Sequence, residues 1–254
     1  MNQKTAAKFF LPFAAAAVIV GIWQIVCDAG AVPRFMLPSP AAVCSAFISE
    51  FPLLMRHLRV TLFEAACGLA LSVAFALILA LVMDMNRYIK AALEPVLLFT
   101  QTLPSIVIAP LLVLWFGYET MPKIVLIFIT CFFPLAVSLV NAFAQTDKDA
   151  VNLLKSMGAK KVHIYCCLKL PQSMPAFFAG LRISASYAMI GAVIAEWLGG
   201  SAGLGVYMIR VRKSYSFDKM FACLVLTMLL SMALLYAAIF LEWYAMPWKR
   251  HANR

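Results

Sequence analysis

The segment KSMGAKKVHIYCCLKLP, residues 155–171, lies between two long apolar runs at residues 124–143 and 177–198. It is basic and contains a glycine, whereas the chain as a whole is 64% hydrophobic and has a mean hydropathy of +0.91. Soluble globular chains contain about 25% charged residues, and only 13% of the residues are charged here. Because the apolar residues come in runs, the composition predicts a polytopic membrane protein.

Six apolar runs have about the 20 residues that a helix needs to cross ~30 Å of hydrocarbon. The runs are residues 9–27, 58–83, 95–116, 124–143, 177–198 and 220–241. Each run is expected to be a helix, because a span in lipid has to satisfy its own backbone hydrogen bonds. The first run is longer than the apolar part of a signal peptide and no A-x-A site follows it, so it is interpreted as an uncleaved span. The sequence therefore predicts an all-α membrane protein in which residues 1–254 form a single domain with six transmembrane helices.

Basic residues near the span ends indicate the orientation, because cytoplasmic segments carry an excess of Lys and Arg. With both termini inside, the inner segments contain Lys4, Lys8, Arg87, Lys90, Lys148, Lys155, Lys160, Lys161, Lys169, Lys249, Arg250 and Arg254. The outer segments contain Arg34, Arg56, Arg59, Lys123, Arg210, Arg212, Lys213 and Lys219. Twelve inner residues against eight outer ones favour cytoplasmic termini. The net charge of +10 is attributed to lipid headgroups rather than to nucleic-acid binding.

Residues 144–176 form the one sizeable inner loop, and their pattern predicts two short helices that meet at a glycine. Thr146 or Asp147 can cap the first helix, and Gly158 can end it in a left-handed conformation without strain. The first apolar stripe consists of Ala150, Leu153, Leu154 and Met157, and the second consists of Val162, Tyr165 and Leu168 with Pro171 closing the helix. The corner between the helices carries Lys160, Lys161 and His163.

The loop from Thr146 to Pro171 has a net charge of +3, and the residues alone leave two interpretations open. It could lie on anionic headgroups as an amphipathic segment. It could instead be a docking knob, with its apolar stripes packed on the membrane helices and its polar corner facing a cytoplasmic partner.

Several residues are candidates for a translocation pathway or gate. Pro104, Pro110 and Pro134 interrupt the third and fourth spans, either as ordinary kinks or as the broken helices that line substrate routes in transporters. Glu196 is an acid deep in the fifth span and could line a gate, pair with Arg210 or Arg212, or be hydrated at the interface. The segment GGSAGLG, residues 199–205, includes Gly203 and Gly205 and could form a tight outer turn or a flexible loop.

The inner loop resembles the EAA loop of binding-protein-dependent ABC importer permeases, whose pattern is E-A-A-x3-G-x9-I-x-L-P. Aligned on Gly158, residues 152–154 read Asn-Leu-Leu in place of E-A-A, while Leu170 and Pro171 match the end of the pattern at the same spacing. Other segments are similar to the nitrate/sulfonate/taurine branch of these permeases. They are LPSP (37–40), QTLPSIVIAPLLVLWFGY (101–118), FFPLAVSLVNAF (132–143), LPQSMPAFFAGLRISASYA (170–188) and IAEWLGGSAGLGVYM (194–208). In that branch a basic residue is expected where this chain has Glu64.

The resemblance implies a type I ABC importer permease-like bundle in a bacterial inner membrane. Its implied partners are a cytoplasmic ATP-binding-cassette ATPase dimer, a second permease copy in a homodimer, an extracytoplasmic substrate-binding protein and membrane lipid. The residues implied in ATPase coupling are Asn152, Ser156, Gly158, Ala159, Lys160, Lys161, His163, Leu170 and Pro171. Those assigned to the pathway or gate are Pro104, Pro110, Glu196, Gly203 and Gly205.

The chain contains no G-x-x-x-x-G-K-[ST] phosphate loop, so it is not expected to be an enzyme, and ATP hydrolysis is assigned to a partner. Its seven cysteines form no metal-binding spacing, and no catalytic, metal or cofactor site is expected. IAPLLVLWFGY and AEWLGG look most like permeases for thiamine pyrimidine precursors, ahead of those for sulfonates, taurine or nitrate. The alternative function is a small proton-coupled secondary transporter or channel, which would need more intramembrane acids or histidines.

Overall fold

In the computed structural model, residues 3–30, 32–33 and 36–248 are described, and the side chains of residues 3–10, 12 and 13 are not. Several basic residues used above to predict the orientation therefore lie outside the described part. They are Arg34, Lys249, Arg250 and Arg254, together with the side chains of Lys4 and Lys8. The single domain predicted for residues 1–254 likewise extends beyond the described residues at both ends.

The described part of the chain is helical and contains no strand. The first half consists of α1 (Gln3–Asp28), α2 (Pro40–Ser49), α3 (Phe51–Met85), α4 (Arg87–Thr100), α5 (Ser105–Phe116) and α6 (Thr120–Ala144). The second half consists of α7 (Lys148–Ser156), α8 (Lys161–Ile164), the π-helical turn η1 (Tyr165–Lys169), α9 (Leu170–Leu198), α10 (Leu204–Lys213) and α11 (Phe217–Ala245). An all-α fold is thus confirmed.

Four of the predicted spans lie within helices that are long and apolar enough to cross a membrane. These helices are Phe51–Met85, Thr120–Ala144, Lys161–Leu198 and Phe217–Ala245. A bent pair, α4 and α5, provides a fifth span if it is counted as one. The predicted first span lies in α1, whose described apolar part, Ala14–Asp28, is shorter than a span. Length and composition of the described residues therefore support four or five spans, and the sixth stays a prediction.

The predicted third span, residues 95–116, is a broken helix and not merely a kinked one, which decides between the two interpretations of Pro104. The chain breaks between Thr100 and Ser105, and the helices on either side are inclined by 100°. Pro104 lies at this break as the N-cap of α5, where its missing N–H costs no helical hydrogen bond. The helix before the break is also longer than the predicted span, because α4 begins at Arg87, capped by the Asn86 side chain.

Small residues on α3 allow it to pack closely against α6. The buried residues Ala65, Gly68, Ser72 and Ala76 recur at helical spacing along one face of α3. At Gly68, a Cβ would lie 2.5 Å from Ile127 Cγ2 of α6, so a larger residue does not fit. The Ser72 hydroxyl also hydrogen-bonds the Phe128 carbonyl at 3.0 Å. This combination is typical of helix pairs in membranes, where close backbone approach and interhelical hydrogen bonds drive association.

The central helix α6 is joined to α9 in the same way. The Ser184 hydroxyl donates to the Cys131 carbonyl at 2.8 Å, and the Cys131 thiol donates to the Ser184 carbonyl at 3.2 Å. On the other side of α9, Arg182 pairs with Glu242 of α11 at 3.1 Å. Few side chains of α11 are buried, as expected for a helix that faces lipid.

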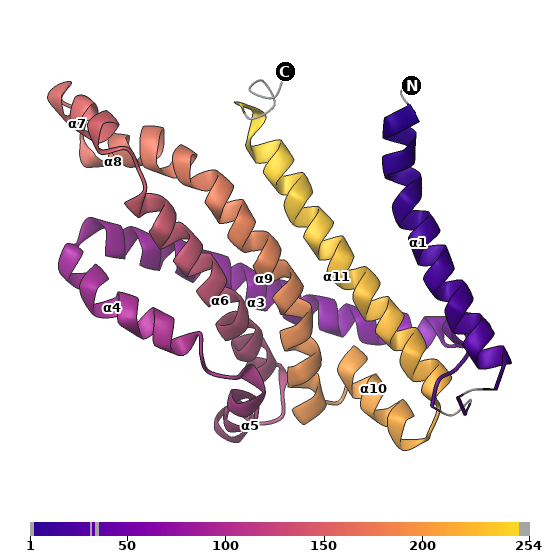
Figure 1. Cartoon of the computed structure of the whole chain (residues 1–254). Coiled ribbons are helices and arrows are strands. Elements are labelled where there is room, and N and C mark those ends of the chain that lie inside the picture. The colour runs from indigo at the N-terminus through magenta and orange to yellow at the C-terminus, as the bar shows by residue number, and fades with distance from the viewer. Residues whose placement is uncertain (1–2, 31, 34–35, 249–254) are drawn as a thin grey trace.

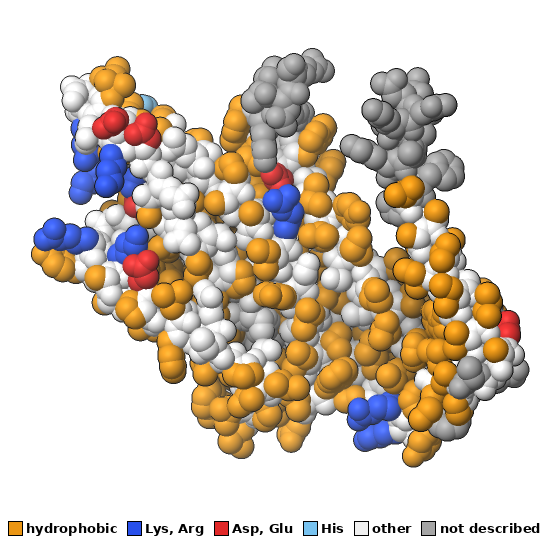
Figure 2. Space-filling model, viewed as in Figure 1, with side chains coloured by type: hydrophobic (Ala, Val, Ile, Leu, Met, Phe, Trp, Pro, Cys, Tyr) orange, Lys and Arg blue, Asp and Glu red, His pale blue; other side chains and the backbone are white. Residues whose placement is uncertain are grey.

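The helices place α7 and α8 at one end of the bundle and α5 and α10 at the other. Figure 1 shows α6 rising to α7 and α9 returning from α8, while the start of α1 and the end of α11 lie at the same end as α7. Lys and Arg side chains gather near α7 and α8 and again over α10, with hydrophobic side chains between them (Figure 2). The molecule thus has two polar ends and an apolar middle.

Candidate functional site

The tip of the inner loop is formed by α7, Gly158 and α8. The Asp147 side chain caps α7 by accepting a hydrogen bond from the Asp149 N–H, so the capping residue is Asp147 rather than Thr146. Gly158 adopts a φ of +80°, the left-handed conformation predicted for it. The Gly158 N–H donates to the Lys155 carbonyl and the Ala159 N–H donates to the Leu154 carbonyl. These two bonds form a Schellman motif, which ends α7 and sets the direction of α8.

The second half of the loop differs from the prediction. Pro171 does not close a helix but lies in the first turn of α9, where proline is tolerated. The preceding turn, η1, is π-helical, and the Leu170 N–H donates to the Tyr165 carbonyl five residues earlier. Inside a regular α-helix the Pro171 ring would clash with the carbonyl four residues back, and the wider turn lies at that position. The chain from Lys161 to Leu198 therefore runs on as one helical segment.

The apolar stripes pack on the membrane helices only in part, because Tyr165 lies against Phe143 of α6 whereas the large apolar side chains at the tip are exposed, contrary to that part of the docking-knob interpretation. α7 has no buried residue, and Leu153, Met157 and Val162 are 63%, 74% and 73% exposed. Ile164 is the one buried residue of α8. The other candidate coupling residues on the tip are also largely exposed, namely Asn152, Ser156, Lys160, Lys161 and His163, with Ala159 partly buried. The tip is thus an exposed surface that combines large apolar side chains with lysines.

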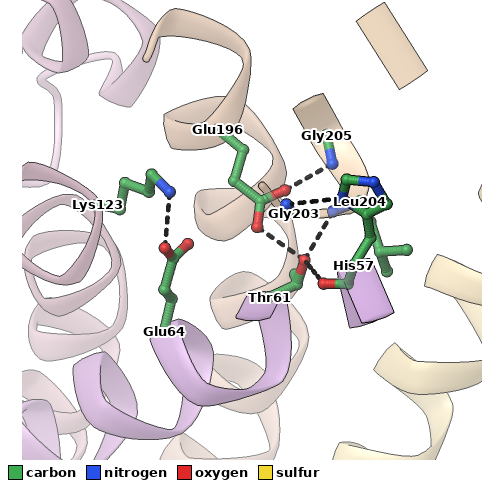
Figure 3. A network of polar contacts seen from close by, with 8 residues as sticks. All are labelled: His57, Thr61, Glu64, Lys123, Glu196, Gly203, Leu204 and Gly205. Atoms are coloured by element: carbon green, nitrogen blue, oxygen red, sulfur yellow. Dashed lines mark hydrogen bonds and ion pairs between the residues drawn. The ribbon is translucent and has the colours of Figure 1, made fainter. Parts of the chain in front are cut away.

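Glu196, Gly203 and Gly205 meet at the opposite end of the bundle. Glu196 Oε1 accepts a hydrogen bond from the Thr61 hydroxyl at 2.7 Å, and Oε2 accepts one from the Gly205 N–H at 2.5 Å (Figure 3). Thr61 Oγ1 in turn accepts the Leu204 N–H. The Glu196 carboxylate and Thr61 therefore satisfy two of the free backbone donors at the N-terminus of α10, where an acid is favoured.

Glycine is required at both positions beside Glu196. At Gly203, which has a φ of +128°, a Cβ would lie 2.2 Å from the Glu196 carboxyl carbon. At Gly205, a Cβ would lie 2.7 Å from the Val193 carbonyl oxygen. The Gly203 N–H also donates to His57 Nδ1 at 3.0 Å. Segment 199–205 is therefore a tight turn fixed to α3 and α9, which decides between the two interpretations of this segment.

The environment of Glu196 excludes two of its three interpretations. Glu196 is 2% exposed, so it is not a hydrated interfacial carboxylate. Its partners are Thr61 and Gly205 rather than Arg210 or Arg212, because no ion pair joins it to either arginine among the described residues. Nearby, burial followed by the charge of Glu50 raises the pKa of Tyr207 on α10, which keeps this phenol neutral.

Glu64, which occupies a position where a base is expected, forms an ion pair with Lys123. Glu64 Oε1 and Lys123 Nζ are 2.7 Å apart, and the side chains are 0% and 5% exposed (Figure 3). The pair joins α3 to the first turn of α6. Lys123 was assigned to an outer loop in the orientation count, whereas it is buried inside the bundle. The sequence carries a signal for this pair in its two isolated charges of opposite sign within or beside apolar runs.

A cavity of about 520 Å³ lies where the α4–α5 break faces α6 and α9. Its lining includes the polar residues Thr100, Gln101, Ser105, Thr130, Ser138 and Tyr187, together with apolar side chains, and contains no charged residue. A second cavity of about 550 Å³ shares Ser138 and continues past Asn141, Gln145, Thr146 and Gln172. An uncharged polar track therefore follows one face of α6 and α9.

The two proline candidates lie close to this track but not in it. Pro104 is flanked by Leu103 and Ser105, which line the first cavity, while Pro110 is exposed on α5. Of the predicted pathway residues, the structure brings Glu196, Gly203 and Gly205 together and leaves the prolines apart from them. The polar residues of α6 were missed, although Thr130, Ser138, Asn141 and Gln145 recur at helical spacing in an apolar sequence.

The fold and these surfaces define a helical membrane protein. It has an exposed loop at one end of the bundle, residues 144–176, and an internal polar track. The family model for the "Binding-protein-dependent transport system inner membrane component" matches residues 72–242, and the chain belongs to this family. The resemblance noted from the loop pattern is thereby confirmed. The chain is a permease component of an ABC importer and not an enzyme, since a separate ATPase subunit hydrolyses ATP in these transporters. A proton-coupled secondary transporter is set aside.

Relatives of known class cover almost the whole chain. A probable ABC transporter permease protein of Haemophilus influenzae is 38% identical over 230 residues, which cover 91% of this chain and 94% of the relative. The formylaminopyrimidine transport permease protein ThiX of Halalkalibacterium halodurans is 33% identical over 234 residues, covering 92% and 93%. The putative aliphatic sulfonates transport permease protein SsuC of Bacillus subtilis is 29% identical over 213 residues, covering 83% and 77%.

The fold is also similar to that of a solved transporter. A crystal structure of an amino acid ABC transporter with histidines contains a chain that matches with a TM-score of 0.63, covering 77% of this chain and 95% of that one. The identity is 15%, so the likeness concerns the fold alone.

Proposed function

We propose that two copies of this chain form the translocation pathway of an ATP-driven importer, each held through residues 144–176 by a cytoplasmic ATPase dimer. The observation that carries this proposal is the exposed tip of the loop. Leu153, Met157 and Val162 are large apolar residues that neither the bundle nor a neighbouring helix covers, and exposed apolar patches with a polar rim are typical of interaction sites. Lysines surround them, and Gly158 fixes the angle between the two helices that carry them.

In the proposed topology the whole chain acts as one permease domain in a bacterial inner membrane, with six crossings by α1, α3, the bent α4–α5 pair, α6, α9 and α11. Both termini are then cytoplasmic and share the side of α7 and α8. This assignment is supported by the positions of the start of α1 and the end of α11 in Figure 1. The opposite end, which carries α10 and the turn at residues 199–205, then faces an extracytoplasmic substrate-binding protein.

The proposed substrate route is the uncharged track along α6 and α9, which a second copy of the chain would close. Ile183, Tyr187 and Ile190 line the cavity, yet they are 49%, 46% and 54% exposed, so one wall of the route is open in the single chain. Glu196, Gly203 and Gly205 contribute as a rigid outer turn beside this route rather than as contacts to the solute. Pro104 contributes by breaking the third span, so that Leu103 and Ser105 reach the cavity.

A charge reversal at the tip tests the coupling. Replacing Lys160 and Lys161 by glutamate should weaken ATPase retention about tenfold or more, because like charges at an interface cost several kcal/mol. The measurement is the amount of ATPase that co-purifies with the chain at moderate salt. The matched control replaces Arg212 and Lys213, two exposed bases on α10, by glutamate as well, and it should leave ATPase retention unchanged. Equal retention in all three proteins would remove the basic corner from the docking surface.

We propose that the solute is a formylaminopyrimidine-like thiamine precursor rather than a sulfonate, taurine or nitrate. ThiX is more similar to this chain, and over more of its length, than SsuC. The cavity lining supports the same choice, because an anion there would lose its hydration without gaining a cationic partner. Uptake into proteoliposomes containing the permease, the ATPase and the binding protein should favour labelled formylaminopyrimidine over taurine by at least about tenfold. Preferential uptake of taurine would contradict this assignment.

A further inference from the structure

The inner end of α3 is joined to the loop through one carboxylate. Asp84 Oδ2 accepts hydrogen bonds from the Tyr165 hydroxyl and from Lys169 Nζ, each at 2.5 Å. The Lys169 and Asp84 side chains are 16% and 13% exposed, so this ion pair is screened less by solvent than one on an open surface. We refer to Asp84, Tyr165 and Lys169 as the Asp84 clamp. It joins residues more than 80 positions apart in the sequence.

Tyr165 and Lys169 of the clamp lie at the two ends of the π-helical turn η1, between α8 and α9. Lys169 Nζ lies 5.0 Å from the centre of the Tyr165 ring, which adds a cation–π contact. The same ring packs edge-on against Phe143 of α6, with centroids 6.3 Å apart and planes at 87°. η1 therefore contacts both α3 and α6, and π-turns of this kind are frequent at functional sites.

Movement of the loop tip reaches both α6 and α9 through the backbone, because the two ends of the loop continue into these helices. On the α9 side, Lys161–Leu198 is a single helical segment. The Asp84 clamp is the loop's direct contact with the inner end of α3, which otherwise follows only through its packing on α6 and α9. α3 bears Glu64 and Thr61 near its far end, where they bind Lys123 and Glu196. α3 thus extends from the clamp to the polar cluster at the outer turn.

We propose that the Asp84 clamp is the coupling element that makes α3 move together with α9 when the ATPase moves the loop. This inference rests on the proposed ATPase docking, but it concerns transmission and not docking. If the clamp is released, the tip still binds the ATPase and α9 still follows it, while the inner end of α3 is no longer moved directly by the loop and lags behind. ATP hydrolysis then continues and import falls.

The test compares Asp84→Asn with the unaltered chain in proteoliposomes that contain the ATPase and the substrate-binding protein, with labelled formylaminopyrimidine and labelled taurine as probes. Three quantities are measured: ATPase retention, thermal melting in detergent, and solute imported per ATP hydrolysed. Asp84→Asn should leave ATPase retention unchanged and lower the solute imported per ATP about tenfold, the effect of losing one charge-assisted bond between two conformations. The melting temperature should fall by only a few degrees, because the pair is partly exposed and the bundle stays folded. The control Glu94→Gln removes an acid from the neighbouring helix α4 and should change none of them.

Two further variants separate transmission from folding. Tyr165→Phe removes only the hydroxyl and keeps the ion pair, so it should lower import per ATP by a smaller factor than Asp84→Asn. The exchange Asp84→Lys with Lys169→Asp should restore at least part of the import that either single charge reversal loses. If Asp84→Asn imports as much solute per ATP as the unaltered chain, the coupling role of the clamp is contradicted, while the proposed function still holds. Loss of ATPase retention in Asp84→Asn would also overturn it, whereas an unaltered chain that retains no ATPase would contradict the proposed function itself.

Discussion

Replacing Lys123 by methionine should lower the free energy of unfolding of the bundle by about 3–5 kcal/mol. Glu64 is fully buried, and Lys123 Nζ is the partner of its Oε1. Its Oε2 has no hydrogen-bond partner, so the carboxylate has no second donor to replace the lysine. Removing one member of a buried ion pair leaves an uncompensated charge, which costs more than the pair contributed. The measurement is the melting temperature in detergent, which should fall by several degrees.

The double variant Glu64→Gln with Lys123→Met provides the control for this prediction. It removes both charges, so it should be markedly less destabilised than Lys123→Met alone, and the difference isolates the cost of the orphaned carboxylate. Replacing the exposed Lys213 by methionine should have no measurable effect. The prediction is contradicted if Lys123→Met melts at the same temperature as the unaltered protein, or if the double variant is the less stable of the two.

Replacing Gly158 by proline should abolish ATP-driven import while leaving the bundle folded. Proline fixes φ near −65°, whereas Gly158 has a φ of +80° and uses its N–H to bond the Lys155 carbonyl. The native corner would then cost about 3 kcal/mol or more, which reduces its population by roughly a hundredfold. The Gly158 site has no neighbouring atom within 4 Å of a Cβ, so the membrane helices should be unaffected. Import and melting are measured on the same preparation.

Alanine at the same position separates backbone strain from steric hindrance. The methyl group of Gly158→Ala would contact no neighbouring atom, so its one cost is the left-handed backbone conformation, about 1–2 kcal/mol. Import should therefore be reduced but retained, and ATPase binding should fall by less than in the proline variant. Equal import by the glycine, alanine and proline proteins would show that the loop corner has no part in coupling.

The first helix of the loop and its glycine corner could be predicted from the sequence because their signals are local. An N-cap, an apolar stripe and a glycine act within one helix. The cap could therefore be narrowed to Thr146 or Asp147, and Leu153 and Gly158 could be placed, without knowing any distant contact. The orientation of the stripe was wrong for a tertiary reason. Leu153 and Met157 satisfy a helical period equally well whether their face packs on the bundle or on another molecule, and the single chain leaves them exposed.

The bend between α4 and α5 and the outer polar cluster were beyond the reach of periodicity. Thr100 and Ser105 lie inside one apolar stretch, and hydropathy does not distinguish a straight span from two helices inclined by 100°. Lys123 was placed in water because lysine is seldom buried, yet its partner Glu64 lies 59 residues away. The polar track was missed because each hydroxyl or amide side chain alone is compatible with a lipid-facing helix.

Crosslinking from the loop tip to the ATPase tests the central claim most directly. In a chain whose exposed cysteines Cys44, Cys166 and Cys167 are replaced by serine, a cysteine at the 74% exposed position of Met157 is joined to neighbouring proteins by a short bifunctional maleimide. The assembly is first shown to import solute. The account predicts an ATPase adduct from this position and none from a cysteine at the exposed position of Lys213 on α10. An importing assembly that gives no adduct at position 157, or gives one at position 213, would contradict it.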